Sequence, residues 1–327
     1  WSSDVCSSDL ESFYAATLRK VVNDSIGAFI DEVAPKQSMY YQLQRMLTTA
    51  NETQRQRIIC NMEQCRWRWK EPMKATGKRI VVNIPAFYLY AFDGNGVLDM
   101  KVGCGAIATK TPQLTSEIKY MEVNPLWNIP TSIIEHDVAR RAGDSAYFAR
   151  NRYFIVNKNT GDKMEIGDVS RAMLLSGKYR VSQEGGRGNS LGRIVFRFPN
   201  NFSVYLHDTS TRGFFARDHR GVSHGCVRVE KPFELAKYLL GNADEWTLDK
   251  LRISMGMRAE TERGRSYVAR TPEDDRKLVS SLGVHPPVPL YIIYRTIYPD
   301  AQGNIQFHPD VYGFDAIIWS NLKPYMQ

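Results

Sequence analysis

The chain has 327 residues, 43% of them hydrophobic, which is enough to fill one large domain or two ordinary ones. Its formal net charge of +8 suits contact with anionic polymers, but Lys and Arg are scattered, unlike the basic stripe typical of nucleic-acid-binding proteins. No run of about 18 apolar residues occurs, so no membrane-spanning helix is predicted.

Residues 1–10 form a polar segment that is rich in Ser and Asp and has no hydrophobic periodicity. They look like a non-native lead, so they and Cys6 are excluded from the fold prediction. Because the chain does not begin with Met, we expect the true N-terminus, and any export signal on it, to be missing.

Residues 11–78 are predicted to form a helical scaffold, which we expect to be truncated. Asn51 followed by Gln54 is typical of a capping box at a helix start. Apolar side chains then repeat at helical spacing: Ile58, Met62, Cys65 and Trp69. Cys60 and Cys65 are five residues apart, so on a helix their side chains would point about 140° away from each other. This separation argues against a disulfide between them. The cysteines predicted to be free and buried are Cys60, Cys65 and Cys104.

From residue 79 the hydrophobic period changes to two, which predicts a mainly β domain over residues 79–327 and an α+β fold for the chain. Pro232 and Gly241 are expected to bound a helix within it. The predicted strands cover 80–84, 86–92, 97–102, 192–198 and 202–207, followed by a hairpin of 289–297 with 304–307.

Residues of about 128–185 break the strand pattern and are predicted to be a capping subdomain inserted into the β domain. Short helical pieces are expected at 133–141 and 168–175. Aromatic side chains in this insertion either line the entry to a cleft or pack the insertion's own core, and the second role is the more frequent one. They are Tyr147, Phe148, Tyr153 and Phe154.

Two neighbouring motifs carry chemistry: YLHDT at 205–209 and SHGCVR at 223–228. A thiol nucleophile needs a base to remove its proton and backbone N–H groups to hold the oxyanion. Cys226 supplies the thiol, His207 supplies a base, and Gly225 lets the backbone turn so that successive N–H groups point at one oxygen. The motifs therefore predict a cysteine acyl-transfer enzyme.

The neighbours of Cys226 distinguish it from an inert core cysteine. His224 and Arg228 supply positive or hydrogen-bonding groups, which are expected to lower the pKa of the thiol. His207 ends a predicted strand on its polar face.

A zinc site is the competing interpretation, with His207, His219, His224 and Cys226 as ligands. His224 and Cys226 lie only two residues apart, which is an unusual ligand spacing. No second cysteine or suitably spaced carboxylate completes a known pattern. We therefore expect neither a metal nor a cofactor.

These motifs resemble those of the L,D-transpeptidase family, which has a YkuD-type catalytic domain, and within it the large capped YcbB-like subgroup. Supporting matches extend over about 61–315, with VNIPAF at 82–87, NPLWNIP at 124–130, NSLG at 189–192 and DVYG at 310–313. The loop EGGRG at 184–188 replaces a shorter Pro-Gly turn, so the rim of the donor cleft is expected to differ. A peptidoglycan-binding module is not recognisable.

The resemblance implies a reaction on peptidoglycan stem peptides. His207, oriented by the carbonyl of Asp208, takes the proton of Cys226. The sulfur then attacks the carbonyl of the L-centre of diaminopimelate in a tetrapeptide and expels D-Ala. The N–H groups of Gly225 and Cys226, with His224, hold the oxyanion. The residues implied to shape the loop and bind substrate are Ser223, Arg228, Tyr205 and Asp208.

In the second implied step, the diaminopimelate amine of another stem resolves the thioester and gives a 3→3 cross-link. Penem-type β-lactams mimic the donor amide and are implied to acylate Cys226, and the function places the enzyme in the periplasm. Two alternatives share the fold: an L,D-carboxypeptidase and an enzyme that anchors or releases wall proteins. A non-catalytic wall-binding module is a third, against which the intact pair of His207 and Cys226 argues.

Overall fold

The structure, a computed structural model, describes residues 7–23, 25–67, 73, 76–94 and 96–326. The chain divides into two compact units, one formed by residues 1–72 with 313–327 and the other by residues 73–312. The sequence prediction placed the whole of 79–327 in the β domain. The C-terminal residues from Gly313 onward instead belong to the helical unit.

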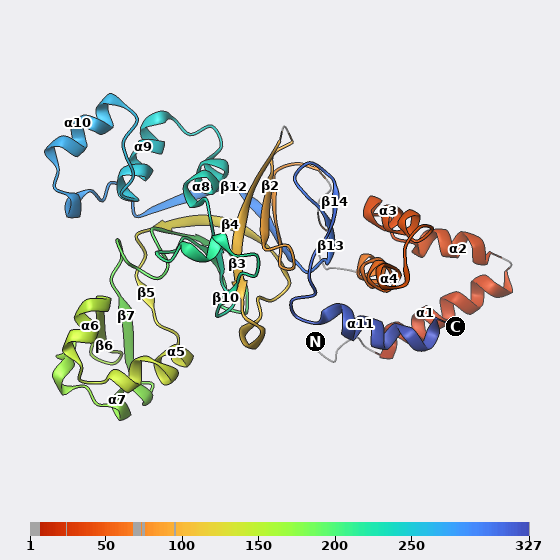
Figure 1. Cartoon of the computed structure of the whole chain (residues 1–327), viewed down its shortest axis with the longest axis horizontal. Helices are drawn as coiled ribbons and strands as arrows, with labels where there is room; N and C mark the ends of the chain where they lie inside the picture. Colours follow the sequence, from red (N-terminus) through yellow and green to blue (C-terminus); the bar gives the residue numbers. More distant parts are fainter. Residues whose placement is uncertain (1–6, 24, 68–72, 74–75, 95, 327) are drawn as a thin grey trace. The chain divides into compact units, whose positions relative to one another are not determined.

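The helical unit consists of α1 (Ser7–Val22), α2 (Ile26–Val33), α3 (Ser38–Met46), α4 (Glu52–Arg66), α11 (Phe314–Leu322) and the 3₁₀ turn η6 (Lys323–Tyr325). Figure 1 shows α11, in blue, among the helices of this unit. The reason is a direct contact of α11 with α4, where Cys60 Sγ donates a hydrogen bond to the carbonyl of Asp315 over 3.4 Å. None of the described helices is long and apolar enough to cross a bilayer.

The predicted start of α4 is confirmed as a capping box. Asn51 Oδ1 accepts from the Gln54 N–H at 3.0 Å, and Gln54 Oε1 accepts from the Asn51 N–H at 3.1 Å. Cys65 is free and buried, as predicted, and so are Cys60 and Cys104. Trp69, the last member of the predicted apolar repeat, lies outside the described residues.

The β unit contains a nine-stranded sheet in the order β10-β3-β11-β9-β8-β4-β12-β1-β2. A further pairing of β2 with β3 closes this sheet into a barrel, with β10 attached beside β3. The mainly β domain is thereby confirmed. Its strands are β1 (Arg79–Asn83), β2 (Tyr88–Phe92), β3 (Val97–Gly105), β4 (Leu114–Val123), β8 (Ile194–Arg197), β9 (Leu206–His207), β10 (Gly221–Ser223), β11 (Val227–Val229) and β12 (Ser281–Ile293).

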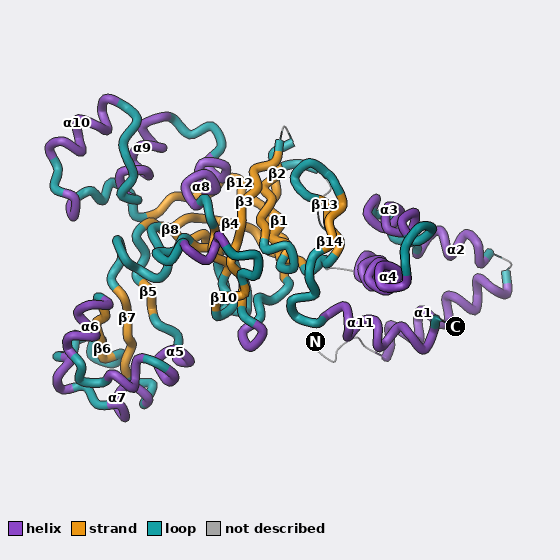
Figure 2. Tube along the Cα trace, viewed as in Figure 1, coloured by secondary structure: helices purple, strands orange, loops and turns teal. Residues whose placement is uncertain are grey.

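Helices and a small hairpin complete the unit around the barrel (Figure 2). Helix α8 starts with Pro232 in its first turn and ends at Gly241, which has a φ of 63°, as the sequence predicts. The remaining elements are α9 (Glu245–Ser254), α10 (Glu262–Arg270), the 3₁₀ turns η1 (Ile107–Thr109), η4 (Gly213–Ala216) and η5 (Glu273–Asp275), and the hairpin β13 (Ile297–Pro299) with β14 (Ile305–Phe307).

The strand predicted over 202–207 is largely wrong, because only its last two residues form β9. Asn200 holds the preceding residues as a loop: its Oδ1 accepts from the N–H groups of Phe202 and Val204, at 3.0 and 3.2 Å. Ser203 has a φ of 55°, which a strand does not permit. A side chain that bonds to its own loop has displaced the strand pairing.

The insertion has a three-stranded sheet of its own, in the order β5-β7-β6, that the sequence did not reveal. Its predicted helical pieces are present. Its elements are β5 (Trp127–Asn128), α5 (Thr131–His136), η2 (Val138–Arg141), α6 (Ser145–Asn151), β6 (Tyr153–Asn157), η3 (Ile166–Asp168), α7 (Arg171–Leu175) and β7 (Tyr179–Gln183). Phe148 is buried and contacts Tyr147 and Tyr153 edge-on, so these aromatic side chains pack the insertion's own core. Phe154 lies under the Lys163 ammonium, 4.8 Å from it.

Candidate active site

Cys226 lies in a tight turn between β10 and β11. Gly225 has a φ of 116°, a conformation that residues with a side chain rarely adopt, so glycine is needed there. Ser223 fixes the turn: its hydroxyl donates to the Cys226 carbonyl at 2.6 Å and accepts from the Gly225 N–H at 3.1 Å. The thiol is thus held by a loop whose geometry is set by its own hydrogen bonds.

A second layer supports this turn from β3 and the end of the β unit. Thr111 Oγ1 donates to the Gly225 carbonyl at 2.8 Å and accepts from the Gly105 N–H at 2.8 Å. The Tyr312 hydroxyl donates to the Gly105 carbonyl at 2.7 Å and accepts from the Thr111 N–H at 3.1 Å. Sequence reasoning missed Thr111, because a threonine more than 110 positions from Cys226 carries no signal of its role.

Strands β9 and β11 bring the two predicted catalytic residues into the same part of the barrel. They pair in parallel, with Arg228 aligned with His207, and the Val227 N–H donates to the Tyr205 carbonyl at 3.0 Å. Within the described part of the chain, however, no hydrogen bond joins the His207 ring to the Cys226 sulfur. The Tyr205 ring contacts His207 edge-on, with 5.8 Å between the ring centroids.

The pKa of Cys226 is raised, which is opposite to the expected direction. Burial is the largest cause, and it outweighs the lowering by hydrogen bonds to the main chain and hydroxyl of Tyr205 and by the charges of Arg197 and Arg228. Of the two groups expected to lower it, Arg228 does so, whereas His224 is exposed. The resting form of Cys226 is therefore the neutral thiol.

His207 is buried, which corrects the expectation of a polar strand face. Its Nδ1 donates to the Asp208 carbonyl at 2.5 Å, the contact that the family resemblance implied. Burial, and next the charge of Arg228, lower its pKa to about 3, while hydrogen bonds with the main chain of Asp208 and Leu191 oppose the shift. The ring is neutral at neutral pH, and its Nε2 can act as a base.

Tyr205 links this histidine to the thiol and to a partly exposed ion pair. The Arg197 guanidinium lies 4.7 Å from the centre of the Tyr205 ring and forms an ion pair with Glu122 at 2.8 Å. Burial and the proximity of Cys226 raise the pKa of Tyr205, so its hydroxyl stays protonated and can donate to the sulfur. Arg197 was not foreseen, because its role depends on β8 lying next to β9.

The backbone donors that the family resemblance implies for the oxyanion have different hydrogen-bond partners in the structure. The Gly225 N–H is used by Ser223 Oγ, so this group is occupied within the loop. The Cys226 N–H makes no hydrogen bond within the described residues, and the Tyr205 hydroxyl lies at the sulfur. These two donors, and not the Gly225 N–H, are available to a developing oxyanion.

The polar residues implied to bind substrate have distinct surroundings. Asp208 is buried, and its carboxylate accepts from the Arg193 N–H at 2.9 Å and pairs with Arg212 at 3.4 Å. The Ser223 hydroxyl is used within its own loop. Arg228 lies beside Phe214, and its Nε is buried without a hydrogen-bond partner among the described residues. Arg228 is thus the member of this group with unused hydrogen-bonding capacity.

The residues of the alternative zinc site are not gathered. Within the described ranges, no group of three or more His, Cys, Asp or Glu side chains is placed to hold a metal ion. His224 is exposed, and the His219 ring lies edge-on against Phe87, 5.3 Å from it.

Comparison with known proteins identifies a family domain in the region just described. The L,D-transpeptidase catalytic domain, YkuD, matches residues 77–247, which include the turn with Cys226 and the strand with His207. A Haemophilus influenzae protein described as a "Putative L,D-transpeptidase" is 30% identical over 324 residues, covering 95% of this chain. The chain spans 60% of the length of that relative.

Solved structures give only partial superpositions. An L,D-transpeptidase from Mycobacterium smegmatis is 15% identical with a TM-score of 0.27, covering 49% of this chain and 52% of its own. The structure of the L,D-transpeptidase LdtMt1 in complex with imipenem is 12% identical with a TM-score of 0.26, covering 66% of this chain and 59% of its own.

Proposed function

Because this chain belongs to the L,D-transpeptidase (YkuD) family, we propose that it cross-links peptidoglycan stem peptides through a thioester on Cys226. The observation that carries the proposal is the placement of Cys226 directly before β11 and of His207 on β9, the strand paired with β11, inside the matched domain. A neutral histidine close to a cysteine thiol supplies the base and the nucleophile that this kind of catalysis requires.

In the first step, His207 Nε2 takes the thiol proton as the sulfur attacks the carbonyl of the L-centre of diaminopimelate in a tetrapeptide stem. The bond from this carbon to the nitrogen of D-Ala breaks, the nitrogen receives the proton from His207, and D-Ala leaves. Because the resting thiol is protonated, the transfer to His207 must accompany the attack. Since the structure shows no hydrogen bond between the His207 ring and the Cys226 sulfur among the described residues, we expect substrate binding to bring the two side chains into contact.

In the second step, the side-chain amine of another stem's diaminopimelate attacks the thioester. Its proton passes to His207 and then to the departing sulfur, so the enzyme is restored and a 3→3 cross-link remains. The Tyr205 hydroxyl and the Cys226 N–H are suited to hold the oxyanion in both steps. Neither step uses a metal or cofactor.

The same thiol is expected to react with β-lactams of the penem type, which present a strained amide to a nucleophile. A solved L,D-transpeptidase in complex with imipenem supports this proposal. The proposed substrate lies in the cell envelope, so we place the enzyme in the periplasm. A carboxypeptidase, with water as acceptor, and a wall-protein anchoring enzyme, with a protein lysine as acceptor, require the same first step.

Mass spectrometry of a purified disaccharide-tetrapeptide incubated with the protein tests this function. We expect a cross-linked dimer and free D-Ala, neither of which forms with Cys226→Ala. Cys65→Ala, which removes a buried thiol of the helical unit, is the matched control and should keep the activity. Tripeptide without dimer would indicate the carboxypeptidase instead. Turnover by Cys226→Ala would overturn the nucleophile assignment.

A further inference from the structure

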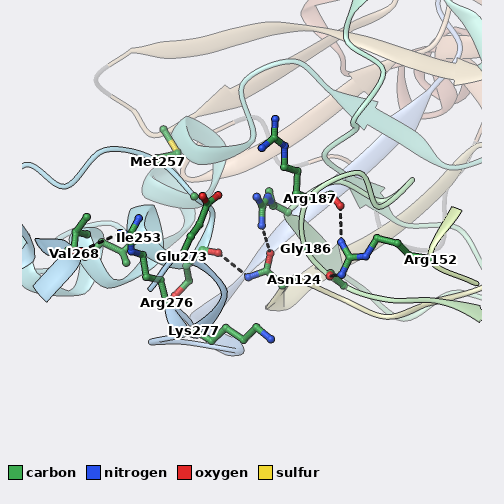
Figure 3. Close-up of a pocket in the computed structure, with 14 residues that line it drawn as sticks. Asn124, Arg152, Gly186, Arg187, Ile253, Met257, Val268, Glu273, Arg276 and Lys277 are labelled. Carbon is green, nitrogen blue, oxygen red and sulfur yellow. Dashed lines mark hydrogen bonds between the residues drawn. The ribbon is translucent and has the colours of Figure 1, made fainter. Parts of the chain in front are cut away.

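A cavity of about 310 Å³ lies in the β unit, and Figure 3 shows the residues that line it. We call it the basic pocket; it is lined mainly by the 185–187 loop, by Arg152 and Arg193, and by the segment after α10. Neither Cys226 nor His207 is among its lining residues. Its volume lies at the lower end of the range of ligand sites and exceeds what one small ion needs.

The charges that line the basic pocket are strongly unequal. Among the described residues that line it, Glu273 is the one carboxylate, set against five cationic side chains: Arg152, Arg187, Arg193, Arg276 and Lys277. Arg152 also pairs with Glu184, which lies outside the lining, at 3.3 Å. Arg276 donates to the carbonyls of Thr271 and Val268, at 2.8 and 3.0 Å, and its guanidinium has no ion-pair partner among the described side chains. The pocket therefore carries a net positive charge toward any ligand.

Two of these cations hold the pocket in shape. Arg152 donates to the carbonyls of Gly185 and Arg187, at 3.0 and 2.7 Å, and so fixes the loop that forms one wall. Arg193 donates to Asn124 Oδ1 at 3.2 Å, an uncharged acceptor. A Cβ at Gly256 would lie 3.0 Å from the Arg193 guanidinium, so glycine makes room for it. Burial lowers the pKa of Arg193, and the charge of Glu273 opposes this shift.

Arg193 also connects the basic pocket to the catalytic base. Its backbone N–H donates to Asp208 Oδ2 at 2.9 Å, and the carbonyl of Asp208 accepts from His207 Nδ1. A ligand held at Arg193 thus lies beside the strand that carries the base. The loop at 185–187 supplies the facing wall.

We propose that the basic pocket binds the carboxylates of a stem peptide whose reacting group lies at Cys226. The choice of ligand rests on the proposed function, because stem peptides carry several carboxylates along a short chain. Arginine is well suited to this chemistry, since its planar guanidinium holds a carboxylate through two hydrogen bonds. Exposed Arg187 and Lys277 capture the ligand, and Arg193 holds the carboxylate that enters deepest.

Binding of a tetrapeptide stem to the Cys226→Ala protein, measured by calorimetry, tests the proposal without any turnover. In that background, Arg187→Gln with Lys277→Gln should weaken binding by about tenfold, because two charge-assisted contacts are lost. Glu273→Gln should tighten binding, because it removes the one competing carboxylate. The matched control, Arg171→Gln with Lys237→Gln, removes two exposed cations outside the pocket and should bind as the parent does.

A peptide with amidated carboxyls should bind all of these proteins equally weakly. We call the double variant Arg187→Gln with Lys277→Gln the pocket pair. The proposal would be overturned if the pocket pair bound the peptide as tightly as the control does. It would also be overturned if Glu273→Gln bound the peptide more weakly, or if the parent showed no saturable binding. If the pocket variants lose affinity for inorganic pyrophosphate but keep it for the peptide, the stem-peptide assignment is wrong.

Measurements on the protein that retains Cys226 distinguish this inference from the proposed function. With Cys226 present, acylation by a β-lactam should be the same in the pocket pair and in the control, while the peptide concentration needed for half-maximal cross-linking rises. Peptide binding in the pocket without any cross-linking would overturn the proposed function but support the binding site. Cross-linking that does not change in the pocket variants would overturn the proposed binding site but support the proposed function.

Discussion

The turn that carries Cys226 and the basic pocket use polar groups in opposite ways. In the turn, Ser223 and Thr111 each bond to main-chain groups on both sides, so the protein itself consumes their hydrogen-bonding capacity. In the pocket, Arg276 donates to neutral carbonyls, and Arg152 divides its N–H groups between carbonyls and the Glu184 carboxylate. The first arrangement fixes geometry, and the second attracts a ligand. Variants of the turn should therefore change rate and stability, whereas variants of the pocket should change affinity alone.

The largest effect is expected from the base. His207→Gln should slow acylation of Cys226 by a β-lactam by about 10² to 10⁴-fold, because the thiol is protonated at rest and loses its proton acceptor. His224→Gln alters an exposed ring and should change the rate less than about threefold. Mass spectrometry of the acyl-enzyme over time gives both rates. If the two variants lost the same fraction of the acylation rate, His207 would not be the base.

Burial of the same histidine predicts a pH dependence of stability. The pKa of His207 is about 3 in the folded protein and about 6.5 unfolded, so the unfolded chain binds the proton more readily. The free energy of unfolding should therefore fall as pH drops from 6.5 toward 3, by up to about 1.4 kcal/mol per pH unit. Denaturant titrations at several pH values should show a flatter profile in His207→Gln than in His136→Gln, which alters an exposed histidine. Parallel profiles would contradict the burial of a neutral ring.

Removal of the hydroxyl that braces the turn should lower stability and rate together. Ser223→Ala leaves the Gly225 N–H and the Cys226 carbonyl without this partner, at a cost of about 1–3 kcal/mol in the free energy of unfolding. The acylation rate should fall with it, because the thiol loses its fixed position. Ser210→Ala removes an exposed hydroxyl and serves as the control. A variant that keeps full activity would show that the turn is held by other contacts.

A smaller effect is expected at the tyrosine beside the sulfur. Tyr205→Phe removes a hydrogen bond that lowers the pKa of Cys226, so this pKa should rise further. Alkylation by iodoacetamide, followed against pH, should shift toward higher pH, and acylation should slow by about tenfold. Tyr120→Phe alters an exposed tyrosine on β4 and should leave both unchanged. An unshifted alkylation profile would place the Tyr205 hydroxyl outside the thiol's surroundings.

Local patterns predicted those parts of the fold that depend on neighbouring residues. The capping box at Asn51, the helix between Pro232 and Gly241 and the strands of residues 79–102 all follow from short-range rules, and the structure contains them. The strand over 202–207 was wrong because Asn200 bonds to the main chain of its own loop. The position of α11 was missed because only its contact with α4, far away in sequence, assigns it to the helical unit.

The sequence alone identified the groups on which the proposed chemistry depends: a cysteine in a glycine turn, a histidine at a strand end, and the family motif around them. Tertiary structure decided the burial, the pKa and the hydrogen-bond partners of those groups. Packing buries His207 and partly buries Cys226, which sets the direction of both pKa shifts, and the Gly225 N–H donates to Ser223. It also gathers the cations of the basic pocket from three separate segments. Burial and charge depend on residues distant along the chain, and local sequence rules do not contain those contacts.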